Sequence, residues 1–136
     1  MNTGISTPAR TRTFERCWVL TGAQDGPAGW RFRRRKQSAG EAASVEAAWD
    51  WALDREERFG DVVGFFHTHP RGTDAQPSSR DMRTMNAWCR ALGKPLLCII
   101  AAGRMLNGCL FVYPDGEPQQ VESIHKAERG WYIARA

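Results

Sequence analysis

The chain has 136 residues, of which 42% are hydrophobic and 25% are charged. A chain of this length is expected to bury one core rather than two, and this composition is too apolar for a disordered protein. Its 19 basic residues are opposed by 15 acidic ones, so the net charge of +4 does not by itself indicate a nucleic-acid-binding protein. We expect a single globular domain over residues 12–136, preceded by a flexible polar leader over residues 1–11.

The cysteines include no closely spaced pair of the kind that holds zinc, and three of the four lie in apolar runs where a small thiol packs well. They are Cys17, Cys89, Cys98 and Cys109. Residues 1–12 contain no apolar stretch of signal-peptide length, and no run in the chain is long enough to cross a bilayer. The sequence therefore predicts a cytoplasmic protein with reduced cysteines and no membrane partner.

Two strands open the predicted fold. Cys17–Leu20 is a short apolar run, and Trp30–Gln37 alternates weakly between apolar and polar residues, which is compatible with a hairpin. The second strand carries the densest basic stretch of the chain, Arg31–Lys36. We expect this stretch to form a solvated strand face or an edge strand.

An amphipathic helix is predicted from Glu41 to about Gly60. Its apolar positions recur at helical spacing, at Val45, Ala48, Trp49, Ala52 and Leu53. The next run, Val62–Phe66, has no polar alternation, so we expect a strand that is covered on both faces and leads directly into His67. Pro70 ends this strand, and a polar loop follows it.

A second helix is predicted from about Ser78 to a stop at Gly93, and two apolar strands follow it at Leu96–Ala102 and Leu106–Tyr113. Strand, helix and strand in this order indicate a right-handed parallel crossover. The polar tail beyond Pro114 predicts one further strand or helix. We therefore expect an α/β or α+β fold, with a single mixed sheet flanked by helices.

His67 and His69 are separated by one residue at the end of the predicted buried strand. Because side chains alternate along a strand, both imidazoles lie on the same side and can converge on one metal ion. A pair of this kind at a strand end is more often a polar terminus than a metal site. The histidines alone are therefore a weak signal.

Asp81 strengthens the case for a metal, because it lies in the first turn of the second predicted helix. From there its carboxylate can approach the two histidines. Zinc accepts two imidazoles and one carboxylate, and three protein ligands leave a fourth position for water, as in catalytic sites. The strand end and helix start also border the crevice where open α/β sheets bind ligands. Ser78 and Asp81 equally fit a capping box, in which case Asp81 would serve the helix instead of the metal.

Two other residues are weaker candidates. Asp74, in the loop before Ser78, could replace Asp81 as the third ligand, although the preferred interpretation is an ordinary turn residue. His125 lies in the polar tail with no matching partner pattern, and we expect it at the surface.

The run His67-Thr68-His69-Pro70, followed after seven residues by Ser78-Ser79-Arg80-Asp81, resembles the signature of the JAMM, or MPN-plus, metalloproteases of the JAB domain family. In that family a glutamate precedes a short apolar strand. Glu15-Arg16-Cys17-Trp18-Val19-Leu20-Thr21-Gly22 is similar to this pattern, with Trp18 where a small residue is common. The resemblance runs from about Glu15 to Tyr113. It implies the MPN/JAB, cytidine deaminase-like fold, with Zn2+ held by His67, His69 and Asp81.

The resemblance also implies roles for the residues around the metal. Zinc would lower the pKa of a bound water toward ~7 and polarise the scissile carbonyl. Glu15 would accept the proton of this water and pass it to the leaving amine, and the Ser78 hydroxyl would donate to the developing oxyanion. The glutamates that compete with Glu15 belong to the solvated side of the first predicted helix: Glu41, Glu46, Glu56 and Glu57.

The activity implied by the family is hydrolysis of the peptide or isopeptide bond after the C-terminal tail of a ubiquitin-like protein, which is then the expected partner. Two alternatives remain open. One is a metal-free scaffold domain of the same fold, against which the intact set of Glu15, His67, His69 and Asp81 argues. The other is a DNA-associated relative of the RadC kind, which the Arg31–Lys36 run supports modestly, although nucleic acid is not the expected partner.

Overall fold

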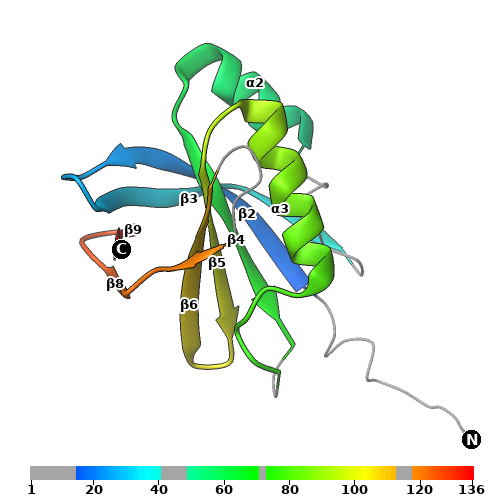
Figure 1. The fold of residues 1–136 in the computed structure, drawn as a ribbon, viewed down its shortest axis with the longest axis vertical. Helices are drawn as coiled ribbons and strands as arrows, with labels where there is room; N and C mark the ends of the chain where they lie inside the picture. The colour runs from blue at the N-terminus through cyan, green and yellow to red at the C-terminus, as the bar shows by residue number, and fades with distance from the viewer. Residues whose placement is uncertain (1–14, 41–48, 71–72, 113–117) are drawn as a thin grey trace, which may run out of the picture.

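Figure 1 shows the computed structural model of the chain, which describes residues 15–40, 49–70, 73–112 and 118–136. Within these residues, one mixed sheet has the strand order β7-β6-β5-β4-β2-β3-β9-β8, and two helices pack on it. The helices are α2 (Trp49–Phe59) and α3 (Ser79–Leu92), and neither is long and apolar enough to cross a membrane. The strands are β2 (Glu15–Gln24), β3 (Gly29–Gly40), β4 (Val62–His69), β5 (Leu96–Ala102), β6 (Met105–Phe111), β7 (Gln119–Gln120), β8 (Ser123–Lys126) and β9 (Trp131–Arg135). The predicted mixed sheet with flanking helices is confirmed as an α+β domain.

The predicted N-terminal hairpin is confirmed. β2 and β3 pair antiparallel, and the turn between them is closed by a hydrogen bond of 2.8 Å from the Asp25 N–H to the Gly29 oxygen. β9 covers β3 only as far as Arg33, and among the described strands Arg34–Lys36 lie beside β2 alone. The expected edge strand is therefore found in the second half of the basic run and not in the first. Arg33, Arg34 and Lys36 are exposed, as expected for a solvated strand face.

The described part of the first predicted helix is α2. Its expected beginning at Glu41 belongs to residues 41–48, which lie outside the described part of the chain. The helix ends at Gly60, as predicted, where φ is 65°, a left-handed conformation that glycine adopts without strain. Ala52 is fully buried against the sheet, and Trp49 and Trp51 pack at the margin of the same core.

The centre of the molecule is β4, which lies between β2 and β5. Most of its residues are buried, which confirms the predicted strand with two covered faces. The chain passes from β4 through α3 to β5, and the two strands pair in parallel, as the predicted crossover requires. α3 follows an N-cap at Ser78 and stops at Gly93, where φ is 71°. The C-terminal end of β4 and the first turn of α3 thus lie at the same edge of the sheet.

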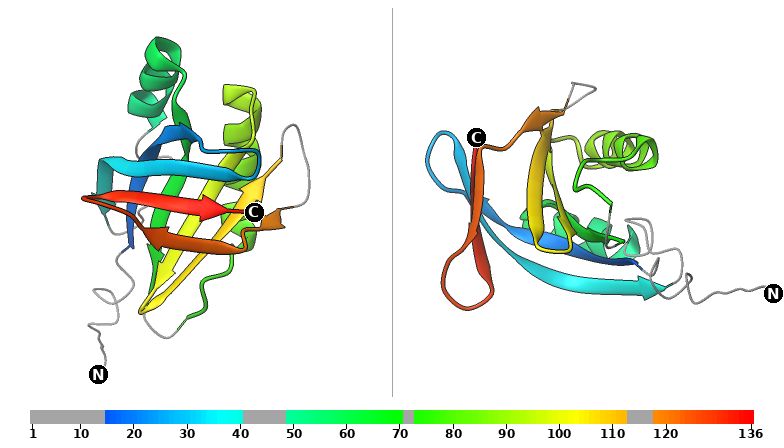
Figure 2. Two further views of the ribbon diagram at one scale, coloured as in Figure 1. Left: turned by 90° about the vertical axis from the view of Figure 1, so that its left-hand side faces the viewer. Right: turned by 90° about the horizontal axis from the view of Figure 1, so that it is seen from below.

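The C-terminal part of the chain contains three strands, where the sequence predicted one strand or helix. β8 and β9 form a hairpin, and β9 pairs with β3. Figure 2 shows that the sheet curls, so that this hairpin crosses β5 and β6 on the side away from the helices. A hydrogen bond of 2.8 Å from the Val121 N–H to the Gly108 oxygen ties the tail to β6.

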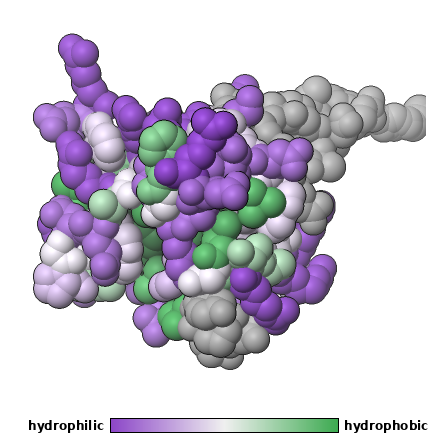
Figure 3. Space-filling view, turned by 90° about the horizontal axis from the view of Figure 1, so that it is seen from above, coloured by the Kyte–Doolittle hydropathy of each residue, from purple (hydrophilic) through white to green (hydrophobic). Residues whose placement is uncertain are grey.

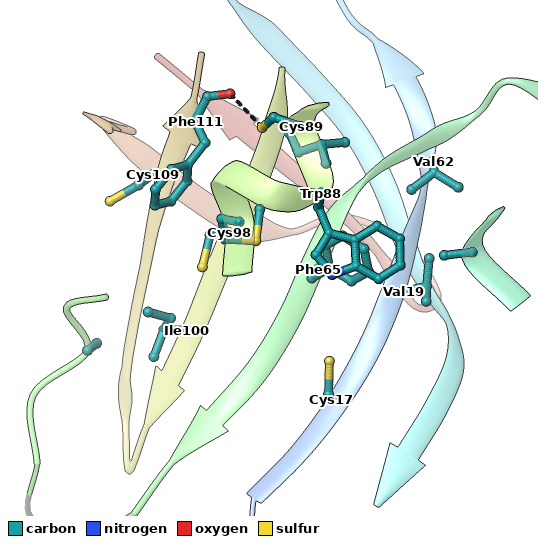
Figure 4. Packing of buried hydrophobic residues seen from close by; sticks show 14 of the residues in the cluster. Cys17, Val19, Val62, Phe65, Trp88, Cys89, Cys98, Ile100, Cys109 and Phe111 are labelled. Carbon is teal, nitrogen blue, oxygen red and sulfur yellow. Dashed lines mark hydrogen bonds between the residues drawn. The ribbon is translucent and has the colours of Figure 1, made fainter. Parts of the chain in front are cut away.

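Each face of the sheet has its own hydrophobic core. Phe65 belongs to the core under the helices, where its ring lies 4.4 Å from that of Trp88, measured between centroids (Figure 4). Phe66 belongs to the core under the C-terminal hairpin, 5.8 Å from the ring of Tyr132. Adjacent residues of β4 therefore serve opposite faces, as strand alternation requires.

All four cysteines are buried in the core under the helices and none forms a disulfide, which confirms the predicted packing role. Cys98 of β5 and Cys109 of β6 are cross-strand neighbours (Figure 4). Burial raises the pKa of both thiols, most strongly that of Cys98. A thiol with a raised pKa is a poor nucleophile and a poor metal ligand at neutral pH.

Candidate metal centre

The two histidines predicted to bind a metal lie at the C-terminal end of β4, where His67 pairs with Ile100 of β5 and His69 pairs with Ala102. Their ring centroids are 5.0 Å apart and their planes are nearly parallel, so both imidazoles are on one side of the strand, as the period of two predicts. His67 is 5% exposed. Most of the surface of the His67 side chain is therefore removed from water, and its Nε2 atom faces the ring of His69.

The predicted ligands His67, His69 and Asp81 bring three donor atoms together. Nε2 of His67 lies 3.2 Å from Nε2 of His69. Oδ2 of Asp81 lies 3.4 Å from the former and 3.1 Å from the latter. In a tetrahedral zinc site with bonds of 2.0–2.1 Å, two ligand atoms are about 3.3–3.4 Å apart. The three observed separations fit this coordination with little movement of the side chains.

Asp81 takes part in both arrangements that the sequence presented as alternatives. Its Oδ2 accepts a hydrogen bond of 2.9 Å from the Ser78 N–H, and its own N–H donates to Ser78 Oγ at 3.0 Å, which completes the capping box. The same Oδ2 lies against the two histidines. A carboxylate oxygen offers two lone pairs, so one atom can cap the helix and face a metal. The capping half of the alternative is confirmed, and the geometry allows the same oxygen to serve a metal as well.

The protonation state of Asp81 suits a cation. Its burial alone would raise its pKa, but hydrogen bonds with His67 and His69 and the N–H of Ser78 outweigh the burial and hold the pKa well below its usual range. Asp81 is therefore ionised at neutral pH. An ionised carboxylate beside two imidazoles is a donor set that zinc accepts.

The loop before α3 orients His69. Its Nδ1 lies 3.1 Å from the main-chain oxygen of Asp74, which accepts the ring proton and leaves the Nε2 lone pair directed at the centre. The Asp74 carboxylate is used elsewhere, since its Oδ1 accepts from the Gln76 N–H at 3.2 Å. Asp74 therefore contributes through its backbone, and the interpretation of its side chain as a turn residue is confirmed.

Ser78 lies one turn before Asp81 and is exposed at the start of α3. Its Oγ accepts the Asp81 N–H. A hydroxyl that accepts one hydrogen bond still has its own proton to donate. The capping role predicted for Ser78 is confirmed, and its O–H remains able to serve a ligand at the same edge of the sheet.

Glu15 is the first residue of β2, and its side chain lies outside the part of the structure that is described. Its backbone position follows from the pairing of β2 with β4, in which Cys17 is opposite His67 and the Arg16 N–H donates to Thr68 Oγ1 at 3.0 Å. Continued by one residue, this antiparallel register brings position 15 opposite His69. The backbone of Glu15 thus begins its strand at the edge where the metal ligands lie.

A residue that the sequence did not single out supports the loop that holds His69. Asn107 of β6 donates from Nδ2 to the main-chain oxygen of Ala75 at 3.1 Å, and the Ala75 side chain is buried in the core under the helices. Gln120 of β7 in turn donates to Asn107 Oδ1. Asn107 interrupts the apolar run of its strand, and this polar interruption is the only signal in the sequence that could have drawn attention to it.

His125 is not part of the centre. It lies exposed on β8, in the hairpin on the side of the sheet away from the helices (Figure 2), so its predicted place at the surface is confirmed.

Comparison with known proteins bears on the same residues. The sequence model of a family described as prokaryotic homologs of the JAB domain matches residues 7–112. This range contains His67, His69, Ser78 and Asp81, and it ends before β7. No curated protein matches the chain.

Proposed function

The chain belongs to the prokaryotic homologs of the JAB domain, and on this premise we propose that it is a zinc-dependent peptidase of ubiquitin-like proteins. It hydrolyses the peptide or isopeptide bond after the C-terminal tail of such a protein. The proposal depends on one observation, the convergence of His67, His69 and Asp81 at distances of 3.1–3.4 Å that suit tetrahedral zinc. Three protein ligands leave a fourth position for water or substrate, as in catalytic zinc sites.

The chain's own residues prepare this chemistry. A bound zinc ion supplies a Lewis acid for the scissile carbonyl and lowers the pKa of water. The Asp74 oxygen fixes the His69 tautomer, so that Nε2 carries a lone pair, and Asp81 contributes a full negative charge. The Ser78 hydroxyl donates to the oxygen that becomes negative as the carbonyl is attacked, a contact that in other hydrolases contributes about 3 kcal/mol.

Glu15 is the general base and then the general acid of the proposed reaction. It takes the proton of the attacking water and delivers it to the leaving amine. The register of β2 and β4 supports this role, because it starts β2 opposite the end of β4. One of its competitors already has partners, since Glu56 Oε1 accepts from Lys94 Nζ at 2.9 Å and from the Val62 N–H at 3.1 Å. A second, Glu57, is exposed on α2. Glu41 and Glu46 lie outside the described residues.

The decisive experiment combines metal content with cleavage. We expect the purified protein to carry about one zinc ion per chain and to release a reporter fused to the C-terminus of a ubiquitin-like protein. His67→Ala and Asp81→Ala should lose both zinc and cleavage, whereas Glu15→Gln should keep zinc and lose cleavage. His125→Ala is the matched control, because that histidine is exposed on β8 and should leave both unchanged.

Full zinc retention in Asp81→Ala would overturn the ligand set, and zinc binding without cleavage of any such fusion would overturn the substrate class. A metal-free scaffold module is the outcome in which neither zinc nor cleavage is found. The four cysteines are buried without forming a disulfide, which agrees with a reducing compartment, and we propose that the protein acts in the cytoplasm.

Contacts within the protein explain the basic residues of β3 without a nucleic-acid partner. Arg31 pairs with Glu128 at 3.0 Å and covers the ring of Trp131, and the Arg34 guanidinium lies 4.5 Å from the centre of the Trp18 ring. These contacts hold the C-terminal hairpin and the sheet together. A DNA-associated function predicts binding that weakens steeply with added salt, and we expect no DNA binding at low salt.

A further inference from the structure

A groove lies between α2 and α3. Its volume is about 630 Å³, within the range of sites that bind small ligands or a short stretch of peptide. The described residues that line it are Trp49, Arg80, Arg83, Thr84, Ala87 and Trp88. Figure 3 views the molecule from the end where the helices lie and shows hydrophobic surface enclosed by hydrophilic side chains. We call this feature the α2–α3 groove.

The floor of the groove is aromatic. The rings of Trp49 and Trp88 meet edge to face with centroids 3.8 Å apart, and Phe65 of β4 supports Trp88 from below. The indole N–H of Trp88 is buried and has no hydrogen-bond acceptor among the described residues. A buried donor without an acceptor is costly. Because this nitrogen is buried, it is the indole ring, and not its N–H, that the groove offers to a ligand.

The rim of the groove is basic. Arg80 and Arg83 are exposed on α3, and neither pairs with a carboxylate of any described residue. Other arginines of the protein do form such pairs: Arg31, Arg55, Arg58 and Arg135. Two guanidinium groups that have no carboxylate partner among the described residues therefore lie beside an aromatic floor. They provide complementary charge for a carboxylate of a ligand.

The α2–α3 groove is linked to the candidate metal ligands through the first turn of α3. Arg80 immediately precedes Asp81, and the lining positions 80, 83, 84 and 87 follow one face of α3 away from the centre. At a rise of 1.5 Å per residue this face is about 10 Å long, which matches roughly three residues of extended peptide. A chain whose scissile bond lies at the metal can therefore continue into the groove.

We propose that the α2–α3 groove binds an acidic segment of the protein substrate next to the bond that is cleaved. Aspartate or glutamate side chains of this segment pair with Arg80 and Arg83, and an apolar side chain packs on Trp49 and Trp88. This inference rests on the proposed peptidase function for its biological meaning, but binding in the groove needs neither zinc nor catalysis.

The test measures binding to the full-length, metal-free protein, so that a peptide carboxylate cannot report binding to zinc instead. The probe is a fluorescein-labelled peptide of alternating leucine and glutamate, and its counterpart replaces each glutamate with lysine. We expect fluorescence anisotropy to show binding of the acidic peptide and no binding of the basic one. Arg83→Glu should weaken the binding of the acidic peptide about tenfold. Arg129→Glu, on the exposed turn between β8 and β9, makes the same change in net charge and should bind as the wild type does.

Equal binding of the two peptides, an unchanged affinity in Arg83→Glu, or an equal loss in Arg129→Glu would each overturn the inference. A second measurement links the groove to cleavage. Placing the acidic segment next to the scissile bond of a reporter fusion should lower KM for the wild type, while Arg83→Glu removes this gain without changing kcat. If no fusion is cleaved but the acidic peptide still binds through Arg83, the peptidase proposal fails and the groove stands.

Discussion

The side-chain amide of Asn107 donates to the main-chain oxygen of Ala75 across 3.1 Å, and the preceding main-chain oxygen, that of Asp74, lies 3.1 Å from Nδ1 of His69. A residue of β6 thereby holds the loop that orients a candidate metal ligand on β4. The contact matters because outer partners of metal ligands fix ring orientation and tautomer.

We expect Asn107→Ala to weaken zinc binding about tenfold while the protein remains folded, because the loss of an outer partner typically costs 10–100-fold in metal affinity. Competition with a chromophoric chelator measures the affinity, and circular dichroism checks the fold. His125→Ala provides the comparison at an exposed position remote from the centre. An affinity equal to that of the wild type would mean that the loop holds His69 without help from β6.

The shared oxygen of Asp81 allows its two roles to be separated. Ser78→Ala removes the acceptor for the Asp81 N–H, so we expect a loss of about 1 kcal/mol in the free energy of unfolding, with zinc still bound. Asp81→Ala should lose a similar amount in the metal-free protein and should also lose zinc. Urea unfolding with and without zinc measures both. If zinc stabilised the Asp81→Ala variant as much as the wild type, Asp81 would not be a ligand.

The pair formed by Arg55 and Asp61 should make stability depend on pH. Two hydrogen bonds of 2.9 and 2.7 Å join the guanidinium to the carboxylate, and the first cause of the lowered pKa of Asp61 is this contact with Arg55. Because the folded protein binds the Asp61 proton more weakly than the unfolded chain, the stabilisation is present above the unfolded pKa of about 4 and is lost as pH falls below it.

Asp61→Asn tests this relationship. Its unfolding free energy should lie below that of the wild type at pH 7, and the difference should shrink as the pH is lowered from about 5 toward 3. Denaturant titrations at several pH values measure the difference. Asp54→Asn is the matched control, because Asp54 forms an exposed pair with Arg58 on the same helix and has little stabilisation to lose. A difference that does not change with pH would rule out the proposed linkage.

Gly64 of β4 should tolerate no side chain. A Cβ atom there would lie 2.1 Å from the main-chain oxygen of Leu97 in β5, and backbone in the middle of a sheet cannot move away cheaply. We expect Gly64→Ala to destabilise the protein by about 3 kcal/mol or more. At Gly108 the nearest atoms are the flexible ends of Ile99 and Ile124, so Gly108→Ala should cost only about 1–3 kcal/mol. Thermal unfolding of the two variants measures the contrast.

The sequence predicted the parts of this molecule that depend on local periodicity. Alternation along β4 put His67 and His69 on one side, and the spacing to Asp81 brought the helix start to the strand end, which the distances of 3.1–3.4 Å bear out. The double use of Asp81 escaped prediction because it depends on the lone pairs of a single oxygen. Sequence spacing carries no information at that scale.

The parts that escaped prediction depend on contacts between distant residues. β7 and β8 are short and mostly exposed, so no apolar run marks them. The bond from Asn107 to Ala75 spans 32 positions and leaves no local pattern. The α2–α3 groove likewise has a floor in which Trp49 and Trp88, from separate helices, pack against each other.

The pairing of β9 with β3 has a consequence for the order in which the protein can be assembled. Trp131 and Arg33 are partners in this ladder, although about a hundred residues separate them in the sequence. The core under the C-terminal hairpin, with Phe66 and Tyr132, therefore stays open on the ribosome until β9 has been synthesised. His67, His69 and Asp81 fall within one short stretch, so these candidate ligands emerge long before that core can close. Zinc captured by the nascent chain would then hold β4 and α3 together before β9 is available to pair with β3.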